Sequence, residues 1–295
     1  MSEVEVHDGD LSEVPARVGV LGGGRMGAGI AHAFLVSGSA VVVVERDEEQ
    51  SDAALERVTS AALASIERGT VAEHIDSLGE RLHVGIDDAL FDGCDLVIEA
   101  VPEDLGLKIA SLRRIENRVG AEVPIASNTS SISIDALAAE LRFPSRLLGM
   151  HFFNPVPASE LVEIVIGAAT EPSLVIAAKS WVSALGKTPV TVRNSPGFAS
   201  SRLGLVVGLE AIRMLEEGVA SAEDIDAAMV LGYKFPLGPL RLTDIVGLDV
   251  RLGIAEYLHS QLGDRFAPPQ LLRDKVAAGE LGRKSGRGFF DWSAG

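Results

Sequence analysis

The stretch that decides the fold is RVGVLGGGRMGAGIA, residues 17–31. The apolar run 18–21 predicts a strand, and the apolar positions that follow Gly27 predict the start of a helix. Between them, Gly22, Gly24 and Gly27 fit G-x-G-x-x-G, whose glycines allow a tight turn, close approach to a pyrophosphate and close packing of helix on strand. An ordinary glycine turn is the alternative, and the flanking strand and helix favour dinucleotide binding. The residues expected to contact the dinucleotide here are Gly22, Gly23, Gly24, Arg25, Met26 and Gly27.

The composition is that of a soluble globular chain with an acidic balance. Of 295 residues, 47% are hydrophobic and 23% are charged, and the length is enough for two domains. The net charge of −16 argues against binding nucleic acid or an anionic membrane, because no field draws phosphates in. No apolar run approaches the ~18 residues of a membrane span, and residues 1–15 predict an acidic, mobile tail rather than a signal peptide. The one cysteine, Cys94, is expected in or near the core of a cytoplasmic protein.

Strand and helix patterns alternate over residues 16–193. Strand patterns fall at 40–44, 82–84, 95–100, 124–127, 147–150, 161–166 and 189–192. Helical patterns fall at 48–66, 71–78, 104–119, 134–141 and 174–185. The alternation predicts an α/β fold with a Rossmann-type, mostly parallel sheet that is covered on both faces and binds ligands at the carboxyl ends of its strands.

The pattern changes at Asn194, and residues 194–295 predict helices only. These fall at 200–217, 225–231, 243–262 and 270–278. Apolar helix faces such as 203–215 either build the core of this second domain or pack against a partner subunit, and the pattern alone does not decide. We therefore expect an N-terminal sheet domain followed by a C-terminal all-helical domain.

Glu45 ends the second predicted strand. A carboxylate at that place accepts hydrogen bonds from both ribose hydroxyls of an adenosine and repels a 2′-phosphate, which favours NAD over NADP. Arg46 beside it weakens this preference, because an arginine accommodates the phosphate. The alternative for Glu45 is a surface acid at a strand end.

His151 directly follows the strand predicted at 147–150, at the sheet edge where ligands are expected. A neutral histidine is the usual general base near neutral pH, although a single histidine is more often structural. Glu163 lies inside the apolar strand 161–166, where a buried acid needs a partner. A dyad of the two meets that need and orients the base, and an edge position facing water is the alternative for Glu163. The other five histidines are interpreted as surface or incidental residues.

Residues 127–131, SNTSS, follow another predicted strand. A hydroxyl there could hydrogen-bond a substrate oxygen, and an ordinary loop or helix cap is the alternative. The sequence has no spacing typical of metal ligands, no nucleophile elbow and no phosphate-binding P-loop, so no metal is expected.

Eight motifs follow one another in unbroken order between residues 17 and 292. They are VGVLGGGRMGAGIA, DLVIEAVPEDLGLK, SNTSSISI, GMHFFNPVPASELVEIV, NSPGF, EDIDAAMVLG, GPLRLTDIVGLD and GRKSGRGFFDW. Together they resemble the L-3-hydroxyacyl-CoA dehydrogenase family, most closely its stand-alone bacterial members that act on 3-hydroxybutyryl-CoA. The resemblance implies an NAD-binding Rossmann domain, a helical domain through which the protein forms a homodimer, and an acyl-CoA substrate.

The resemblance also implies roles for single residues. By this likeness His151 is the catalytic base, Glu163 is its partner, and Asn154 contacts the substrate. Ser130 contacts both substrate and cofactor. The further contacts to NAD that the likeness implies come from Glu103, Lys108 and Lys284.

Two departures from the family bear on activity. The family usually has Asn at the active site in the motif PGFxxNR, and this chain has Ser201 there, which donates one hydrogen bond but reaches less far. The family's CoA-phosphate lysines after the second strand have no match, since residues 51–65 hold no Lys and only Arg57. The sequence therefore does not show how the CoA moiety is held.

The sequence thus predicts an oxidoreductase that interconverts an L-3-hydroxyacyl-CoA, of short chain such as 3-hydroxybutyryl-CoA, and the 3-ketoacyl-CoA, with NAD as hydride carrier. A dehydrogenase of a free hydroxyacid or sugar acid is one alternative. A non-catalytic, crystallin-like NAD-binding protein is another. The pair His151–Glu163 argues against the latter, and Ser201 argues for it.

Overall fold

The computed structural model describes residues 13–293. The chain divides into two compact units, Met1–Asn194 and Ser195–Gly295. Of the acidic tail predicted over residues 1–15, residues 1–12 lie outside the described part of the chain.

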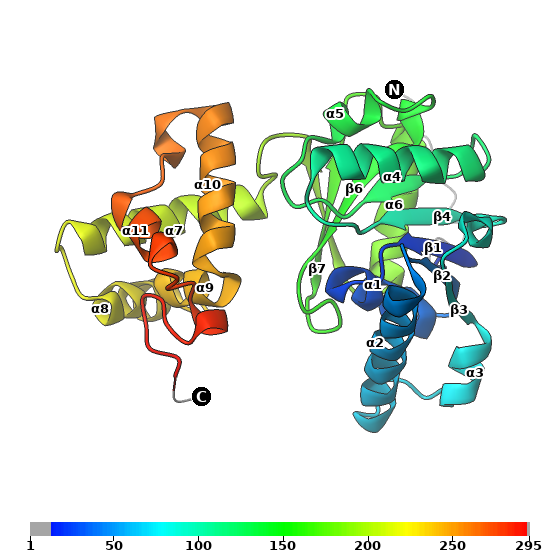
Figure 1. Cartoon of the computed structure of the whole chain (residues 1–295), viewed down its shortest axis with the longest axis horizontal. Helices are drawn as coiled ribbons and strands as arrows, with labels where there is room; N and C mark the ends of the chain where they lie inside the picture. Colours follow the sequence, from blue (N-terminus) through cyan, green and yellow to red (C-terminus); the bar gives the residue numbers. More distant parts are fainter. Residues whose placement is uncertain (1–12, 294–295) are drawn as a thin grey trace, which may run out of the picture. The chain divides into compact units, whose positions relative to one another are not determined.

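The first unit is built on a sheet that has eight strands within the described residues (Figure 1). Their order is β3-β2-β1-β4-β5-β6-β7-β8. The strands are β1 (Arg17–Leu21), β2 (Ala40–Val44), β3 (Leu82–Gly85), β4 (Leu96–Glu99), β5 (Ile125–Ser127), β6 (Leu147–Phe152), β7 (Leu161–Ile166) and β8 (Thr188–Arg193). Neighbouring strands run parallel, except that β7 is antiparallel to β6. The predicted Rossmann-type, mostly parallel sheet is therefore confirmed.

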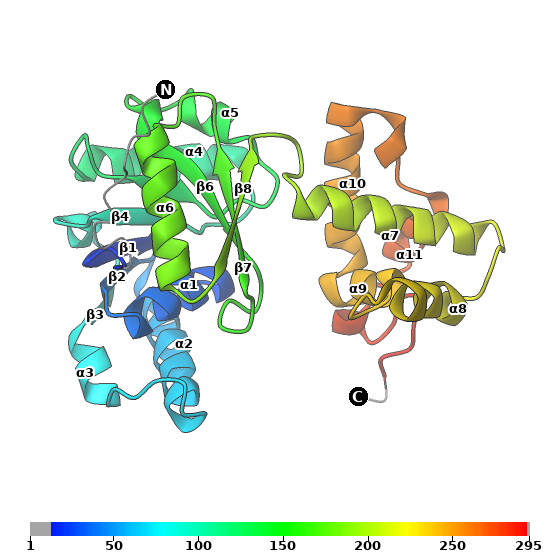
Figure 2. The same cartoon turned by 180° about the vertical axis from the view of Figure 1, so that it is seen from behind.

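Helices cover both faces of this sheet. In Figure 1 the helix α4 lies in front of the sheet, and in Figure 2, the view from behind, α6 comes to the front. The helices are α1 (Arg25–Val36), α2 (Glu48–Glu67), α3 (Ile75–Glu80), α4 (Leu105–Arg118), α5 (Ile134–Ala138) and α6 (Pro172–Ala184). Two short 3-10 turns, η1 (Asp88–Phe91) and η2 (Pro144–Arg146), precede β4 and β6.

The alternation of side chains along the strands sorts the sheet into two faces. One face is apolar: Ile98 of β4, Met150 of β6 and Ile164 of β7 belong to one core with residues of α1, α2 and α6. Because successive strand residues point to opposite faces, the neighbours of these residues project to the other face, which α4 covers. Those neighbours are Glu99, His151 and Glu163; in β5, Ser127 likewise follows Ala126, which belongs to the same core. The sheet thus concentrates its buried polar side chains on one face.

The antiparallel turn between β6 and β7 follows from a short connection. Only residues 153–160 join the two strands, and they include a cis Asn154–Pro155 peptide. A parallel crossover needs a dozen or more residues, so the chain must reverse. The sequence predicted that His151 follows a strand ending at 150, and this is wrong by two residues, since β6 continues to Phe152 and contains His151.

The second unit is helical, as predicted. Its helices are α7 (Ser200–Glu216), α8 (Ala222–Ala227), α9 (Pro239–Val246), α10 (Leu248–Leu262) and α11 (Gln270–Ala277). Shorter turns are the π segment η3 (Ala228–Gly232) and the 3-10 turns η4 (Asp264–Phe266) and η5 (Arg283–Ser285). Leu205, Leu209 and Leu258 belong to its core.

The single helix predicted over 243–262 is wrong. Gly247 has φ 105°, a conformation open to glycine, and separates α9 from α10. The apolar pattern continues across the break because both helices face the same core, so periodicity alone did not show it.

Other expectations met mixed outcomes. Cys94 is buried, at 3% exposure, as predicted. His32 is not at the surface as predicted: it is buried, and its Nε2 lies 3.0 Å from Ser65 Oγ. Another histidine of that prediction, His7, lies outside the described residues. No helix in the described part of the chain has the length and apolar character to cross a membrane.

Candidate functional site

The glycine loop between β1 and α1 has backbone that other residues could not form. Gly22 has φ 94°, and a Cβ on Gly27 would lie 1.7 Å from the carbonyl oxygen of Gly22. Gly24 is the N-cap of α1, is exposed, and has open space where a Cβ would stand. Among residues 13–293, no side chain caps this helix. Its N-terminus is therefore free of a side-chain acceptor and suits an anion.

Glu45 is the first residue after β2, and its side chain connects the end of this strand to the glycine loop. Its Oε1 accepts a hydrogen bond of 2.6 Å from the Gly23 N–H, and its Oε2 accepts one of 3.1 Å from the Arg46 N–H. The Arg46 guanidinium turns instead to Asp47 at 2.9 Å. The carboxylate thus stands beside the loop, and the neighbouring arginine is engaged elsewhere.

His151 and Glu163 form a buried pair across the antiparallel strands. The two residues are register partners in β6 and β7, and His151 Nδ1 lies 2.8 Å from Glu163 Oε2. Both side chains are nearly inaccessible, at 8% and 1% exposure. The Phe153 ring packs on the imidazole with centroids 4.3 Å apart. Because the carboxylate engages Nδ1, it orients the imidazole and favours the tautomer with the proton on Nδ1.

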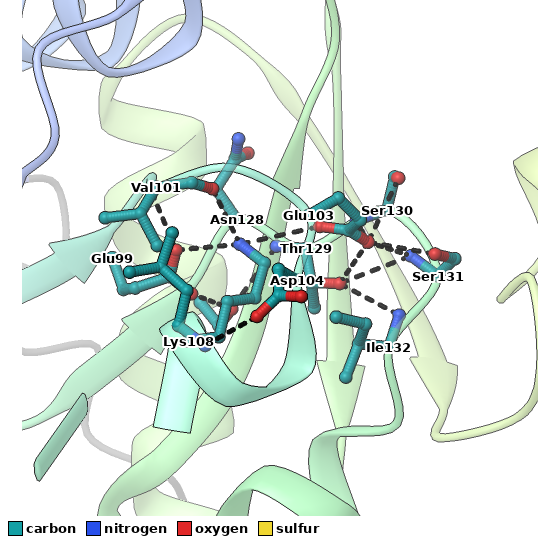
Figure 3. A network of polar contacts seen from close by, with 12 residues as sticks. Glu99, Val101, Glu103, Asp104, Lys108, Asn128, Thr129, Ser130, Ser131 and Ile132 are labelled. Atoms are coloured by element: carbon teal, nitrogen blue, oxygen red, sulfur yellow. Dashed lines mark hydrogen bonds and ion pairs between the residues drawn. The ribbon is translucent and has the colours of Figure 1, made fainter. Parts of the chain in front are cut away.

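The loop after β5 is organised around one carboxylate, Glu103 (Figure 3). Its Oε1 accepts hydrogen bonds from Thr129 Oγ1 at 2.6 Å, from the N–H groups of Ser130 and Ser131 at 3.0 and 2.9 Å, and from both serine hydroxyls. Burial works to raise the pKa of Glu103, but the Lys108 ammonium and these donors outweigh it, so this pKa lies below its ordinary value. Glu103 is therefore ionised, and its carboxylate holds the polar loop in place through these hydrogen bonds.

Lys108 connects this loop to the end of β4. Its Nζ lies 2.7 Å from Glu99 Oε1, 3.1 Å from the Val101 carbonyl and 3.5 Å from Glu103 Oε2. Glu99 also accepts hydrogen bonds from Ser127 Oγ at 2.6 Å and from the Val101 N–H at 2.8 Å. Glu99 and Lys108 are buried, at 0% and 1% exposure. Burial raises the pKa of Glu99, and the Lys108 ammonium opposes it.

The sequence missed two residues of this arrangement. Glu99 was hidden in an apolar strand, and its signal was an acid inside DLVIEA with a lysine nine residues later. Asn128 was taken only as part of a polar loop. Its Oδ1 accepts a hydrogen bond of 2.9 Å from the Phe152 N–H, and its own N–H donates to the Glu99 carbonyl. It joins the end of β6, beside His151, to the loop after β5.

The remaining predicted site residues lie in three places. Asn154 is exposed in the segment after β6. Ser201 and Lys284 belong to the second unit. Ser201 is in the first turn of α7, and Lys284 Nζ lies 2.6 Å from both carboxylate oxygens of Asp249.

Taken together, the first unit holds an anion-binding helix end, a carboxylate suited to a ribose and an oriented histidine. These lie along the sheet between β2 and β7. Such an arrangement has the chemical groups to bind a dinucleotide and to move a proton.

Family models match both units. The model described as 3-hydroxyacyl-CoA dehydrogenase, NAD binding domain, matches residues 17–195. The model described as 3-hydroxyacyl-CoA dehydrogenase, C-terminal domain, matches residues 197–292.

Individual proteins resemble the chain over nearly its whole length. A probable 3-hydroxybutyryl-CoA dehydrogenase of Deinococcus radiodurans is 40% identical over 277 residues, which cover 94% of this chain and 100% of that protein. A 3-hydroxybutyryl-CoA dehydrogenase of Bradyrhizobium diazoefficiens is 39% identical, covering 96% of this chain and 97% of that protein. Among solved structures, the (S)-3-hydroxybutyryl-CoA dehydrogenase of Ralstonia eutropha matches with a TM-score of 0.90 at 41% identity, over 94% of this chain and 99% of that one.

Proposed function

The chain belongs to the 3-hydroxyacyl-CoA dehydrogenase family, and from that premise we propose that it interconverts a short-chain L-3-hydroxyacyl-CoA, such as 3-hydroxybutyryl-CoA, and the 3-ketoacyl-CoA. The observation that carries the proposal is the buried pair of His151 and Glu163, 2.8 Å apart, on the sheet that also bears the glycine loop. A protein that only bound a nucleotide would have no need of an oriented base.

The cofactor is of the NAD type, because the NAD-binding family model spans residues 17–195. The glycine loop fits it: Gly24 leaves open space at the end of α1, and no side chain caps that end. We propose NAD rather than NADP. The support is the Glu45 carboxylate beside the loop, which would repel a 2′-phosphate, while Arg46 pairs with Asp47.

In the proposed reaction the residues of the chain handle the proton. When bound, NAD accepts the hydride that leaves C3 of the substrate. His151 Nε2 takes the proton of the 3-hydroxyl as the C3–H bond breaks and the C3=O bond forms, and it returns this proton in the reverse direction. Glu163 stabilises the imidazolium that results. Both side chains are buried, so water does not compete for the proton.

The neighbouring residues are proposed to position the two ligands. Ser130 would donate its hydroxyl to the substrate oxygen. Glu103, in the segment after β4, and Lys108, in the first turn of α4, would border the cofactor. We propose Asn154 as a substrate contact, Ser201 as a catalytic residue together with Ser130, and Lys284 as a cofactor contact. Ser201 stands at the start of α7.

We propose that the second unit, residues 195–295, forms a homodimer. Apolar side chains of α9 stand exposed at spacings that share one helix face, namely Leu242, Ile245 and Val246. Leu203 of α7 is 65% exposed. A second copy would remove these side chains from water. The single buried cysteine supports a cytoplasmic enzyme.

Assays of the purified full chain test the function. We expect reduction of acetoacetyl-CoA with NADH to be faster than with NADPH and faster than reduction of long-chain 3-ketoacyl-CoA. Turnover of free hydroxyacids without turnover of any CoA thioester would favour the free-acid alternative. Binding of NADH without any turnover would favour a crystallin-like protein. A monomeric mass in light scattering at micromolar concentration would contradict the homodimer.

A further inference from the structure

A buried charged cluster lies directly beside the glycine loop. Glu99, the last residue of β4, is the register partner of Leu21, the last residue before the loop. A Cβ on Gly22 would lie 3.1 Å from the carbonyl carbon and oxygen of Ala100. The loop and the segment after Glu99 are therefore in backbone contact. We call Glu99, Glu103 and Lys108 the β4 cluster.

The β4 cluster and Glu45 lie on opposite sides of the loop. In the sheet order, β2 with Glu45 lies on one side of β1, and β4 lies on the other. A dinucleotide in such a sheet crosses the strand ends with its pyrophosphate at the glycine loop. If Glu45 holds the adenosine ribose, as the proposed function has it, the nicotinamide end falls on the side of β4 and β5.

The β4 cluster has a formal charge of −1, from two carboxylates and one ammonium. In the described part of the chain, the ion pairs of Glu99 and Glu103 involve Lys108 alone. Glu99 accepts hydrogen bonds from three donors, the Lys108 ammonium, the Val101 N–H and the Ser127 hydroxyl. Burial raises the pKa of Glu99, and these donors oppose that rise; the Lys108 ammonium, 2.7 Å from Oε1, favours the carboxylate form. Glu103, with five donors at one oxygen, is a carboxylate for the same reason.

We propose that Glu99 adds a negative charge near the nicotinamide end of the cofactor site and so strengthens the binding of the oxidised cofactor relative to the reduced one. The nicotinamide ring carries a positive charge in NAD⁺ and none in NADH. A fixed negative charge therefore attracts only the oxidised form. Glu99 suits this role better than Glu103, because its side chain is fully buried and ions in solution screen it little. This inference rests on the proposed use of NAD.

The test is the dissociation constants of NAD⁺ and NADH, measured by calorimetry without substrate. In Glu99→Gln we expect the dissociation constant of NAD⁺ to rise on the order of five- to tenfold. One elementary charge produces an effect of this size over roughly 10 Å at an effective dielectric constant of about 30. The constant for NADH should change less than about twofold. An equal change for both forms, or no change, would overturn the inference.

Ser127→Ala is the matched control. It removes a hydrogen bond to the same carboxylate and leaves the charge in place. We expect both dissociation constants to change by the same factor. A selective loss of NAD⁺ binding in this variant would show that geometry, and not charge, sets the preference.

A second variant covers the case in which Glu99→Gln does not fold, as judged by circular dichroism. Glu103→Gln neutralises the β4 cluster from its more exposed side, and the same selective weakening of NAD⁺ is expected. Its absence there would equally overturn the inference. Failure of the proposed function gives a different result, because wild-type protein would then bind neither NAD⁺ nor NADH. If wild type binds both and Glu99→Gln keeps the same ratio of the two dissociation constants, the inference alone is contradicted.

Discussion

Two buried polar clusters lie on the same face of one sheet, and they are built in different ways. His151 and Glu163 come from adjacent antiparallel strands, and each is the register partner of the other. The β4 cluster draws Glu99 from a strand, Lys108 from α4 and Glu103 from the segment between them. The first is fixed by strand pairing, and the second by the packing of a helix on the sheet.

The clusters also differ in how their charges are balanced. The imidazole can change its charge, so the dyad tolerates a proton moving in and out. The β4 cluster combines two carboxylates with one ammonium, and the Lys108 ammonium has three acceptors around it. We infer that the dyad serves chemistry and the β4 cluster serves structure and binding.

The largest effect is expected for His151→Gln. The amide still donates to Glu163 but cannot take a proton, so kcat for acetoacetyl-CoA should fall by about 10²–10⁴-fold. The free energy of unfolding, measured in urea, should change little, because the hydrogen bond to Glu163 is retained. Near-normal turnover would show that the dyad is not the base.

Lys108→Met should act on stability. It leaves the buried Glu99 carboxylate without its ion-pair partner, and removing one partner of a buried ion pair typically costs about 3–5 kcal/mol of unfolding free energy. The double variant Lys108→Met/Glu99→Gln should recover part of this loss, because it removes one uncompensated charge. If Lys108→Met were as stable as wild type in urea unfolding, the β4 cluster would not be structural.

Glu163→Gln should lower kcat by about 10–100-fold, a typical cost of losing the carboxylate that orients a histidine. The dependence of kcat on pH should shift as well, because the imidazolium loses its counter-ion. A purely structural residue would alter stability and leave the pH profile in place.

Ser127→Ala should cost about 1.5–3 kcal/mol of unfolding free energy, the usual contribution of one hydrogen bond to a charged group. The hydroxyl donates to Glu99, which keeps its other two donors. A loss as large as that of Lys108→Met would mean that the cluster depends on the serine rather than on the ion pair.

The smallest effect concerns pH. The pKa of Glu103 is held below its ordinary value, so its contribution to stability is present above the pKa of an unfolded glutamate and is lost as pH falls through the folded pKa. The difference in unfolding free energy between wild type and Glu103→Gln should therefore shrink between pH 6 and acid pH, in the range where a glutamate titrates. A difference that grows on acidification would contradict the assignment.

Sequence patterns predicted a good part of this site because several signals are local. The glycine spacing predicted a loop in which Gly22 has a positive φ and Gly27 has no room for a Cβ. The place of Glu45 at a strand end predicted its position beside that loop. His151 and Glu163 were predicted as a pair because a lone acid in an apolar strand needs a partner, and the structure contains the pair.

Three features follow from local sequence: the alternation of strand and helix, the glycine loop, and the residue types at the strand ends. Each depends only on residues within a few positions along the chain. Only the tertiary structure decided the antiparallel register that brings His151 to Glu163, the burial of Lys108 against Glu99, and the break at Gly247. Each of these depends on which surface a residue meets across the fold. The sequence pattern of a strand is the same whether the adjacent strand is parallel or antiparallel. A lysine on α4 is expected to face solvent, and only the packing of α4 on the sheet shows that Lys108 meets the Glu99 carboxylate.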